Sequence, residues 1–209
     1  MSATKQRSRS VRVYRLRRGS ITPSTTWYHR MIDTARLTLR KYARDDWAAV
    51  HEYASIPAFS EFEIWGPNTA ADSKAFVSRC IEYTDASPIQ RYELAVVLKR
   101  KEKLIGGCGL KIAEASAGEA SLGYAIHPAY QQQGFATEVA TALINFGFRR
   151  LKLARIFAEC DTRNKASCRV MEKAGMARIA TLQNHRQFKG QVSDSFLYEV
   201  LPRQVLNQN

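Results

Sequence analysis

The sequence predicts an α+β fold, in which a mixed, mostly antiparallel sheet of seven strands is flanked by about four helices in a three-layer, α/β/α-like arrangement. Two observations lead to this prediction. Three segments of strand character, 92–98, 104–112 and 120–126, follow one another through short turns, as in an antiparallel meander. A segment with helical spacing comes next, and Val139, Leu143 and Phe146 form its apolar face. This helix is expected to pack on the sheet.

The elements before the meander are predicted from apolar periodicity and from capping residues. Residues 34–42 alternate between apolar and polar side chains, which is typical of a half-buried strand. A helix is expected to start near Asp46, where an acid favours the helix dipole. Thr69 and Asp72 resemble a capping box, and they predict a second helix that runs to about Tyr83.

Two helices and three strands are expected after the meander. The long helix is expected to begin just after Gly134 and to end near Leu151. A second, shorter helix is expected at 164–174, with Gly175 as its C′ residue. Strands are expected at 155–159, 178–182 and 195–201. A hairpin turn is expected at 185–190, between the last two of them.

The formal charge of +13 is distributed unevenly along the 209 residues. Residues 1–30 contain one Lys, seven Arg and no acid, so they contribute +8 and leave +5 for the rest. We therefore divide the chain into a basic, disordered extension (1–30) and one folded domain (31–209). The mildly basic domain suits a polyanionic ligand and does not by itself require DNA.

Residues 1–30 admit three interpretations. They can form a basic arm that makes weak contact with RNA or the ribosome, an organelle-targeting segment, or an upstream extension without function, with Met31 as an equivalent start. We favour the last, because Met31 stands just before the first predicted strand. Deletion of residues 1–30 is then expected to leave folding and activity intact.

The sequence gives no sign of a membrane segment or of a metal site. No apolar run approaches the ~20 residues that a membrane helix needs, and the N-terminus has no apolar secretion signal. The four cysteines have neither C-x-x-C spacing nor clustered histidines, so they are interpreted as reduced core thiols. A cytoplasmic protein without metal is expected, as a monomer or a homodimer.

The start of the long helix is the strongest functional candidate. The first N–H groups of a helix lack intrahelical partners, and the macrodipole adds about half a positive charge there. Gly134 permits close backbone approach or a positive φ, and Ala136 is small, so a pyrophosphate can lie across the amides of residues 132–136. An ordinary strand-turn-helix junction is the alternative.

The spacing Gln131-x-x-Gly134-x-Ala136 resembles the acetyl-CoA pyrophosphate loop of GNAT-superfamily N-acetyltransferases. The segment from Asn164 to Met176 is similar to the second signature of that superfamily, in the form of its RimJ/RimL-like branch. The resemblance covers about residues 34–202. It implies a GNAT-type fold, with acetyl-CoA as co-substrate.

The resemblance also implies which residues contact acetyl-CoA. The backbone of the strand before the loop is expected to pair with the pantetheine arm, through Tyr124, Ala125 and Ile126. The loop and the first helical turn are expected to bind the pyrophosphate, through Gln131, Gln132, Gln133, Gly134, Phe135, Ala136 and Thr137. Asn164 is expected to hold the pantetheine, and Ser167, one turn later, to approach the sulfur.

Acetyl transfer to an amine requires an uncharged nucleophile and a proton for the departing thiolate. Many superfamily members supply that proton from a tyrosine, but Met171 stands at the corresponding position here. Ser167 is the candidate acid in the RimJ/RimL-like form, although Asn164 and Ser167 can also be helix-cap residues. Glu63 is the first candidate for the base, followed by Glu61 and Asp194.

The sequence therefore predicts an acetyl-CoA-dependent N-acetyltransferase, in which the primary amine of the acceptor attacks the thioester of acetyl-CoA directly. The resembled branch suggests the N-terminal amine of a protein, such as a ribosomal protein, and small amines such as polyamines, amino acids or antibiotics are alternatives. A different class is a basic binding protein, in which an inactive domain holds CoA and residues 1–30 contact RNA or the ribosome.

Overall fold

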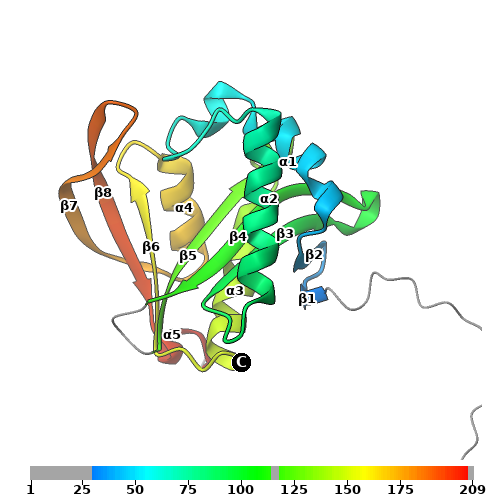
Figure 1. Ribbon diagram of the computed structural model, residues 1–209. Helices are drawn as coiled ribbons and strands as arrows, with labels where there is room; N and C mark the ends of the chain where they lie inside the picture. Colours follow the sequence, from blue (N-terminus) through cyan, green and yellow to red (C-terminus); the bar gives the residue numbers. More distant parts are fainter. Residues whose placement is uncertain (1–29, 114–117, 207–209) are drawn as a thin grey trace, which may run out of the picture.

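The computed structural model in Figure 1 describes residues 30–113 and 118–206. One sheet runs through it in the order β1-β2-β3-β4-β5-β6-β8-β7. The strands are β1 (Arg30–Asp33), β2 (Leu37–Lys41), β3 (Arg91–Leu98), β4 (Lys103–Ile112), β5 (Glu119–Ile126), β6 (Arg155–Asp161), β7 (Ala177–Phe188) and β8 (Gln191–Val200). The helices are α1 (Trp47–Ala54), α2 (Ala70–Asp85), α3 (Phe135–Arg149), α4 (Lys165–Lys173) and α5 (Pro202–Leu206).

The sheet is the middle of three layers (Figure 1). Helices α1 and α2 cover one face, where Val50 and Val77 pack with Ala95 of β3. Helices α3 and α4 cover the other face, and Val139 of α3 belongs to the larger core that includes Leu94 of β3. Leu94 and Ala95 are consecutive, so their side chains point to opposite faces of the sheet. The predicted α+β, three-layer arrangement is confirmed.

The sheet has eight strands in the described residues, so the prediction of seven is wrong by one. The additional strand, β1, pairs antiparallel with β2. Thr34 closes the turn between them, because its N–H donates to the Leu37 carbonyl at 2.9 Å and its hydroxyl accepts from the Leu37 N–H at 2.9 Å. The predicted strand 34–42 therefore begins as a turn and becomes β2 only at Leu37.

The C-terminal hairpin is longer than the sequence predicts. Strand β7 continues to Phe188, so the turn expected at 185–190 is reduced to Lys189 and Gly190. Both turn residues have positive φ, 50° and 73° respectively, as a tight two-residue hairpin turn requires. The last helix, α5, was not predicted, whereas the capping box of Thr69 and Asp72 is confirmed.

Strand β5 leaves its parallel neighbour partway along its length. The pairing of β5 with β6 covers only residues 119–121 against 155–157, although β5 continues to Ile126 and β6 to Asp161. On its other side β5 stays paired with β4 along residues 120–126. The edge of β5 that faces β6 therefore has no strand partner from Leu122 to Ile126 within the described part of the chain.

No helix within residues 30–113 and 118–206 has the length and apolar character needed to cross a bilayer.

Candidate active site

Helix α3 begins beside the separated end of β5. Its N-cap is Gly134, with φ of 79°, and Gln132 in the preceding loop also has a positive φ, of 59°. A Cβ on Gly134 would lie 3.4 Å from an Arg36 guanidinium nitrogen, at the edge of ordinary contact, so it is the positive φ rather than lack of space that favours glycine here. The N-cap has no side chain to accept from the first N–H groups of the helix, which suits an anionic ligand.

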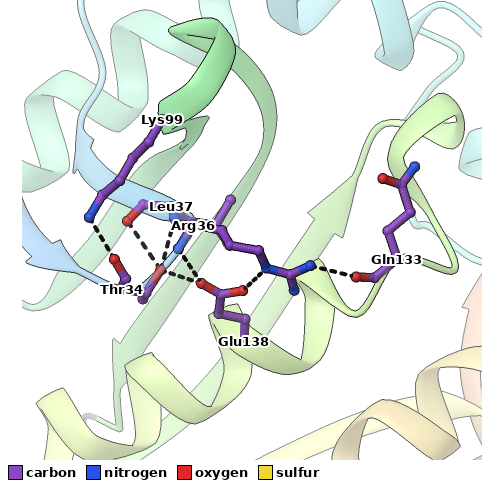
Figure 2. A network of polar contacts seen from close by, with 6 residues as sticks. All are labelled: Thr34, Arg36, Leu37, Lys99, Gln133 and Glu138. Carbon is purple, nitrogen blue, oxygen red and sulfur yellow. Dashed lines mark hydrogen bonds and ion pairs between the residues drawn. The ribbon is translucent and has the colours of Figure 1, made fainter.

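A network around Arg36 and Glu138 holds this helix start in place (Figure 2). Glu138 Oε1 accepts from the Thr34 hydroxyl at 2.6 Å and from the Arg36 N–H at 2.9 Å. Arg36 Nε donates to Glu138 Oε2 at 2.7 Å, and its Nη1 donates to the Gln133 carbonyl at 3.0 Å. The turn between β1 and β2 therefore fixes both the loop and the first turn of α3.

Gln131 connects the loop to the separated strand. Its side-chain amide donates to the Ile126 carbonyl at 3.0 Å. His127, between the two, accepts from the Ala129 N–H through Nδ1 at 3.1 Å and so closes a short turn. These bonds set the path from β5 to Gly134, while His127 has a structural partner and is not a candidate base.

Tyr124 on β5 and Ser167 on α4 join the two sides of the gap between β5 and β6. Their hydroxyl oxygens lie 3.0 Å apart, and the Tyr124 hydroxyl also lies 3.3 Å from the Ser167 carbonyl. Burial raises the pKa of Tyr124 above its ordinary value, although the hydrogen bond with Ser167 acts in the opposite direction. Tyr124 is therefore protonated at neutral pH and can donate a proton.

Asn164 is the N-cap of α4, and its side-chain oxygen accepts from the Ser167 N–H at 3.0 Å. This bond is the capping role that the sequence left open. It also fixes the first turn of α4, and with it the position of the Ser167 hydroxyl. Met171, at the position where many relatives have a tyrosine, is 1% exposed and belongs to the core.

A pocket of about 730 Å³ lies on the opposite face of the sheet, between α2 and the strands β3, β4 and β5. Tyr124 and Ala125 line it, so the pocket reaches the separated part of β5. Gly109 and Gly123 are cross-strand partners in its floor. Nothing lies within 4 Å of the place where a Cβ on Gly123 would be, so the floor is open to the backbone there, whereas at Gly109 the Glu93 carboxylate lies 3.0 Å from the place of a Cβ.

Two cross-strand rows give this floor a charge gradient. The first row consists of Glu93 on β3, Gly109 on β4 and Gly123 on β5, so Glu93 is the only one of the three with a side chain. In the second row, Arg91, Lys111 and Ser121 lie next to one another on β3, β4 and β5. Burial raises the pKa of Glu93, and the ion pair with Arg91 opposes this effect.

Glu63 also lines the pocket, from the loop that precedes α2. Burial raises the pKa of its carboxyl, while the charges of Arg186 and Lys189 and a hydrogen bond with Trp65 act in the opposite direction. The β7–β8 hairpin reaches the same loop, because Lys189 Nζ donates to the Ser60 carbonyl at 2.7 Å. Glu63 is thus a half-buried carboxylate that can accept a proton inside the pocket.

The other acids considered from the sequence lie elsewhere. Glu61 is exposed and does not line the pocket. Asp194 accepts from the Asn184 N–H at 2.9 Å, which stabilises the β7–β8 hairpin. Cys168 is buried, with its sulfur 3.6 Å from that of Cys160, in agreement with its interpretation as a core residue.

Sequence reasoning missed the hydroxyl of Tyr124 and the charged pair in the pocket floor. Tyr124 was predicted only as a backbone contact, because nothing local links it to Ser167. Arg91 and Glu93 did carry a signal, since the period of two puts both on the strand face opposite Leu94. Two charges on that face, which α2 covers, are typical of a functional pocket rather than of a core.

The described residues suit acetyl-CoA better than a metal. No group of three or more His, Cys, Asp or Glu that could hold an ion occurs in the described ranges. The unpaired edge of β5 and the uncapped start of α3 are consecutive along the chain, and they offer hydrogen bonds first to an amide-containing arm and then to a pyrophosphate.

Comparisons with known proteins agree with this geometry. A model described as "Acetyltransferase (GNAT) domain" matches residues 36–177. The uncharacterized N-acetyltransferase YnaD of Bacillus subtilis is 31% identical over 172 residues, which cover 81% of this chain and 96% of that protein. A GNAT-family acetyltransferase structure from Bacillus anthracis superimposes with a TM-score of 0.74 at 30% identity, and the match covers 82% of this chain and 98% of that one.

Two further structures from Vibrio cholerae share the fold alone. A putative ribosomal-protein-serine acetyltransferase has a TM-score of 0.68 at 24% identity, over 82% of this chain and 97% of that one. A spermidine N-acetyltransferase in complex with CoA and spermine has a TM-score of 0.71 at 19% identity, over 83% of this chain and 100% of that one. Their named acceptors differ, so the fold does not determine the acceptor.

Proposed function

Because the chain belongs to the GNAT family of acetyltransferases, we propose that it transfers the acetyl group of acetyl-CoA directly to a primary amine held in the pocket beneath α2. One observation carries this proposal. Tyr124 lines the pocket on one side of the sheet and bonds to Ser167 of α4 on the other. The acceptor pocket and the gap between β5 and β6 therefore meet at this residue.

The residues that would hold acetyl-CoA are those expected from the sequence. The unpaired edge of β5, with Tyr124, Ala125 and Ile126, would bond to the pantetheine arm. The pyrophosphate would lie on the loop and first helical turn, at Gln131, Gln132, Gln133, Gly134, Phe135, Ala136 and Thr137. Acetyl-CoA supplies the thioester from which the acetyl group is transferred.

Glu63 accepts the proton that the acceptor ammonium must lose, directly or through a water molecule. The neutral amine nitrogen then forms a bond to the thioester carbonyl carbon, the carbon–sulfur bond breaks, and the electron pair stays on sulfur. The hydroxyl pair of Tyr124 and Ser167 donates the proton that converts this thiolate to a thiol. The acceptor nitrogen loses its remaining extra proton to solvent, and no acetyl group is attached to the enzyme.

The acceptor that we place first is a peptide N-terminal amine, as in the RimJ/RimL-like branch. An α-amine has an ordinary pKa near ~7.7 to 8.0, against ~10.4 for a lysine side chain, so it needs less help from a base. One half-buried carboxylate, Glu63, then suffices for deprotonation.

Two measurements test the proposal. Acetyl-CoA should raise the melting temperature of the protein in a concentration-dependent way, because it binds the native state. Thiol release and mass spectrometry with N-terminal peptides, polyamines and amino acids should then detect an acetylated product. Binding of acetyl-CoA without transfer to any amine would contradict the proposal and favour a CoA-holding binding protein.

A further inference from the structure

We propose that the acceptor is a primary amine that also carries an anionic group, which Arg79 and Lys111 bind at the far end of the pocket from Tyr124. The inference rests on the proposed function, since it concerns the acceptor of that same reaction. The anionic group can belong to an amino acid whose carboxylate lies several bonds from the amine, or to an acidic residue near a peptide N-terminus, and both offer the same chemistry to the two cations.

The acids that line the pocket already have partners. Glu93 forms an ion pair with Arg91, through Oε1 and Nε. Asp72 accepts from the Thr69 N–H at 2.9 Å and from the Thr69 hydroxyl at 2.7 Å, as part of the capping box of α2. The charges of Arg186 and Lys189 act on Glu63. Because each of these carboxylates already interacts with another group, none of them is free to bind a second ammonium group, as a diamine acceptor would require.

Two cations that line the pocket have no direct ion-pair partner. Within the described residues, the side chains of Arg79 on α2 and Lys111 on β4 form no hydrogen bond and no direct ion pair, although the charge of Arg79 acts on the carboxylate of Asp72. Both side chains are exposed, so they can bind a ligand. An anionic group between them would receive charge-assisted hydrogen bonds, which are stronger than neutral ones.

The strand register and the position of α2 place Lys111 near the C-terminal part of the helix that carries Arg79. Lys111 is the cross-strand partner of both Arg91 and Ser121. The Arg91 guanidinium lies 4.8 Å from the ring centroid of Tyr83, which is one turn after Arg79 on α2. The end of α2 and the row of Lys111 therefore form one cationic end of the pocket.

The opposite end of the pocket belongs to the reaction centre. Ala125 and Tyr124 lie near the end of β5, whereas Ser121 lies near its start. Four residues of extended chain separate Ala125 from Ser121, or roughly 13 Å along the strand. The amine beside Tyr124 and the anionic group beside Lys111 are therefore separated by several bonds, as in 6-aminohexanoate or a short acidic peptide.

The test compares three amines of equal length: 6-aminohexanoate, n-hexylamine and 1,6-diaminohexane. The first is expected to have the highest kcat/KM, roughly tenfold above n-hexylamine, which corresponds to one charge-assisted hydrogen bond. A second arm compares amidated tripeptides that end in glutamate or lysine, and it distinguishes a small amino acid from a peptide as the source of the anion. In Arg79→Gln and in Lys111→Gln, the ratio of kcat/KM for 6-aminohexanoate to kcat/KM for n-hexylamine is expected to fall toward one.

Arg100→Gln is the matched control, because it removes the same charge from the exposed turn between β3 and β4, outside the pocket. Its preference for the anionic amine should equal that of the wild type. Equal turnover of all three amines, a preference for the diamine, or a preference that survives in both variants would overturn the inference alone. Absence of acetyl transfer to every amine would overturn the proposed function as well.

Discussion

The hydroxyl oxygens of Tyr124 and Ser167 lie 3.0 Å apart, although 43 residues separate them in the sequence. They meet because β5 separates from β6 beyond residue 121, and because α4 begins at the edge of that gap. The same tyrosine lines the pocket on the opposite face of the sheet. This pair is therefore where the proposed acetyl donor and the proposed acceptor meet.

Removal of the Ser167 hydroxyl should slow the chemical step more than it weakens acetyl-CoA binding. We expect Ser167→Ala to lower kcat roughly 10- to 100-fold, at or below the low end of general-acid effects, because a thiolate is a good leaving group. The dissociation constant of acetyl-CoA, from calorimetry, should change less than kcat. Tyr124→Phe should have a similar effect, and the double variant little more than either single one, because the two hydroxyls act together.

The control for these variants is Ser78→Ala, which removes an exposed hydroxyl on α2 outside the pocket. It should retain wild-type kcat. If Ser167→Ala also retains it, the Ser167 hydroxyl has only a structural role at the start of α4.

The pH dependence of kcat/KM should report Glu63. Burial raises the pKa of this carboxyl, so the active, deprotonated form is lost as pH falls through a value above ~4.5. Because Glu63 takes the proton from the bound ammonium, log(kcat/KM) should rise with a slope of one below the Glu63 pKa and level off above it, until the acceptor amine itself titrates. In Glu63→Gln the amine must lose its proton in solution, so kcat/KM should be lower and should rise with a slope of one up to the pKa of the amine. A plateau that survives in that variant would assign the base to another group.

Substitution of Gly134 should weaken acetyl-CoA binding. Valine is strained at a φ of 79°. We expect Gly134→Val to raise the dissociation constant at least roughly tenfold, because relief of this strain, which costs about 1–3 kcal/mol, moves the loop amides away from the pyrophosphate. Gly190→Val is the matched control, at a φ of 73° in the β7–β8 turn with nothing within 4 Å. Equal affinity in the two variants would refute the loop assignment.

The bonds of Glu138 should stabilise the protein near neutral pH. Burial alone would raise the pKa of this carboxyl, but hydrogen bonds from Thr34 and Arg36 outweigh burial and lower it. The stabilisation is thus present above the unfolded-state pKa of ~4.3 and is lost as pH falls through the lower folded-state value. We expect Glu138→Gln to lower Tm by about 2–4 °C at pH 7, because solvent screens the half-exposed Arg36.

The Tm difference between this variant and the wild type should shrink toward pH 3. Glu82→Gln, on the exposed side of α2, is the control and should leave Tm nearly unchanged at both pH values. A Tm difference for Glu138→Gln that does not depend on pH would show that packing, rather than the charge of Glu138, supports the start of α3.

The sequence predicted the elements whose signals are local. The capping box of Thr69 and Asp72, the meander and the C′ position of Gly175, at a φ of 85°, each depend on residues close together in the chain. Strand β1 was not predicted, because its four residues at the sheet edge are too few to show a clear alternation of apolar and polar side chains. The predicted division of the chain at residue 30 remains a prediction, since residues 1–29 lie outside the described part and Arg30 starts β1.

The candidate site was predictable only where a motif marked it. Gly134 and Ser167 stand in such motifs, whereas the partner of Ser167, Tyr124, comes from another element and is placed by the course of β5. Arg79 and Lys111 were not predicted as site residues either, because only the packing of α2 on the sheet brings both of them to the pocket.

The most direct measurement is a crystal structure of the protein with CoA and 6-aminohexanoate. We expect the CoA sulfur within about 4 Å of the Tyr124 or Ser167 hydroxyl, as a hydrogen bond to sulfur requires. The amine should lie next to that sulfur, with the carboxylate at Arg79 and Lys111. A CoA molecule bound elsewhere, or a sulfur that does not approach the two hydroxyls, would contradict the account.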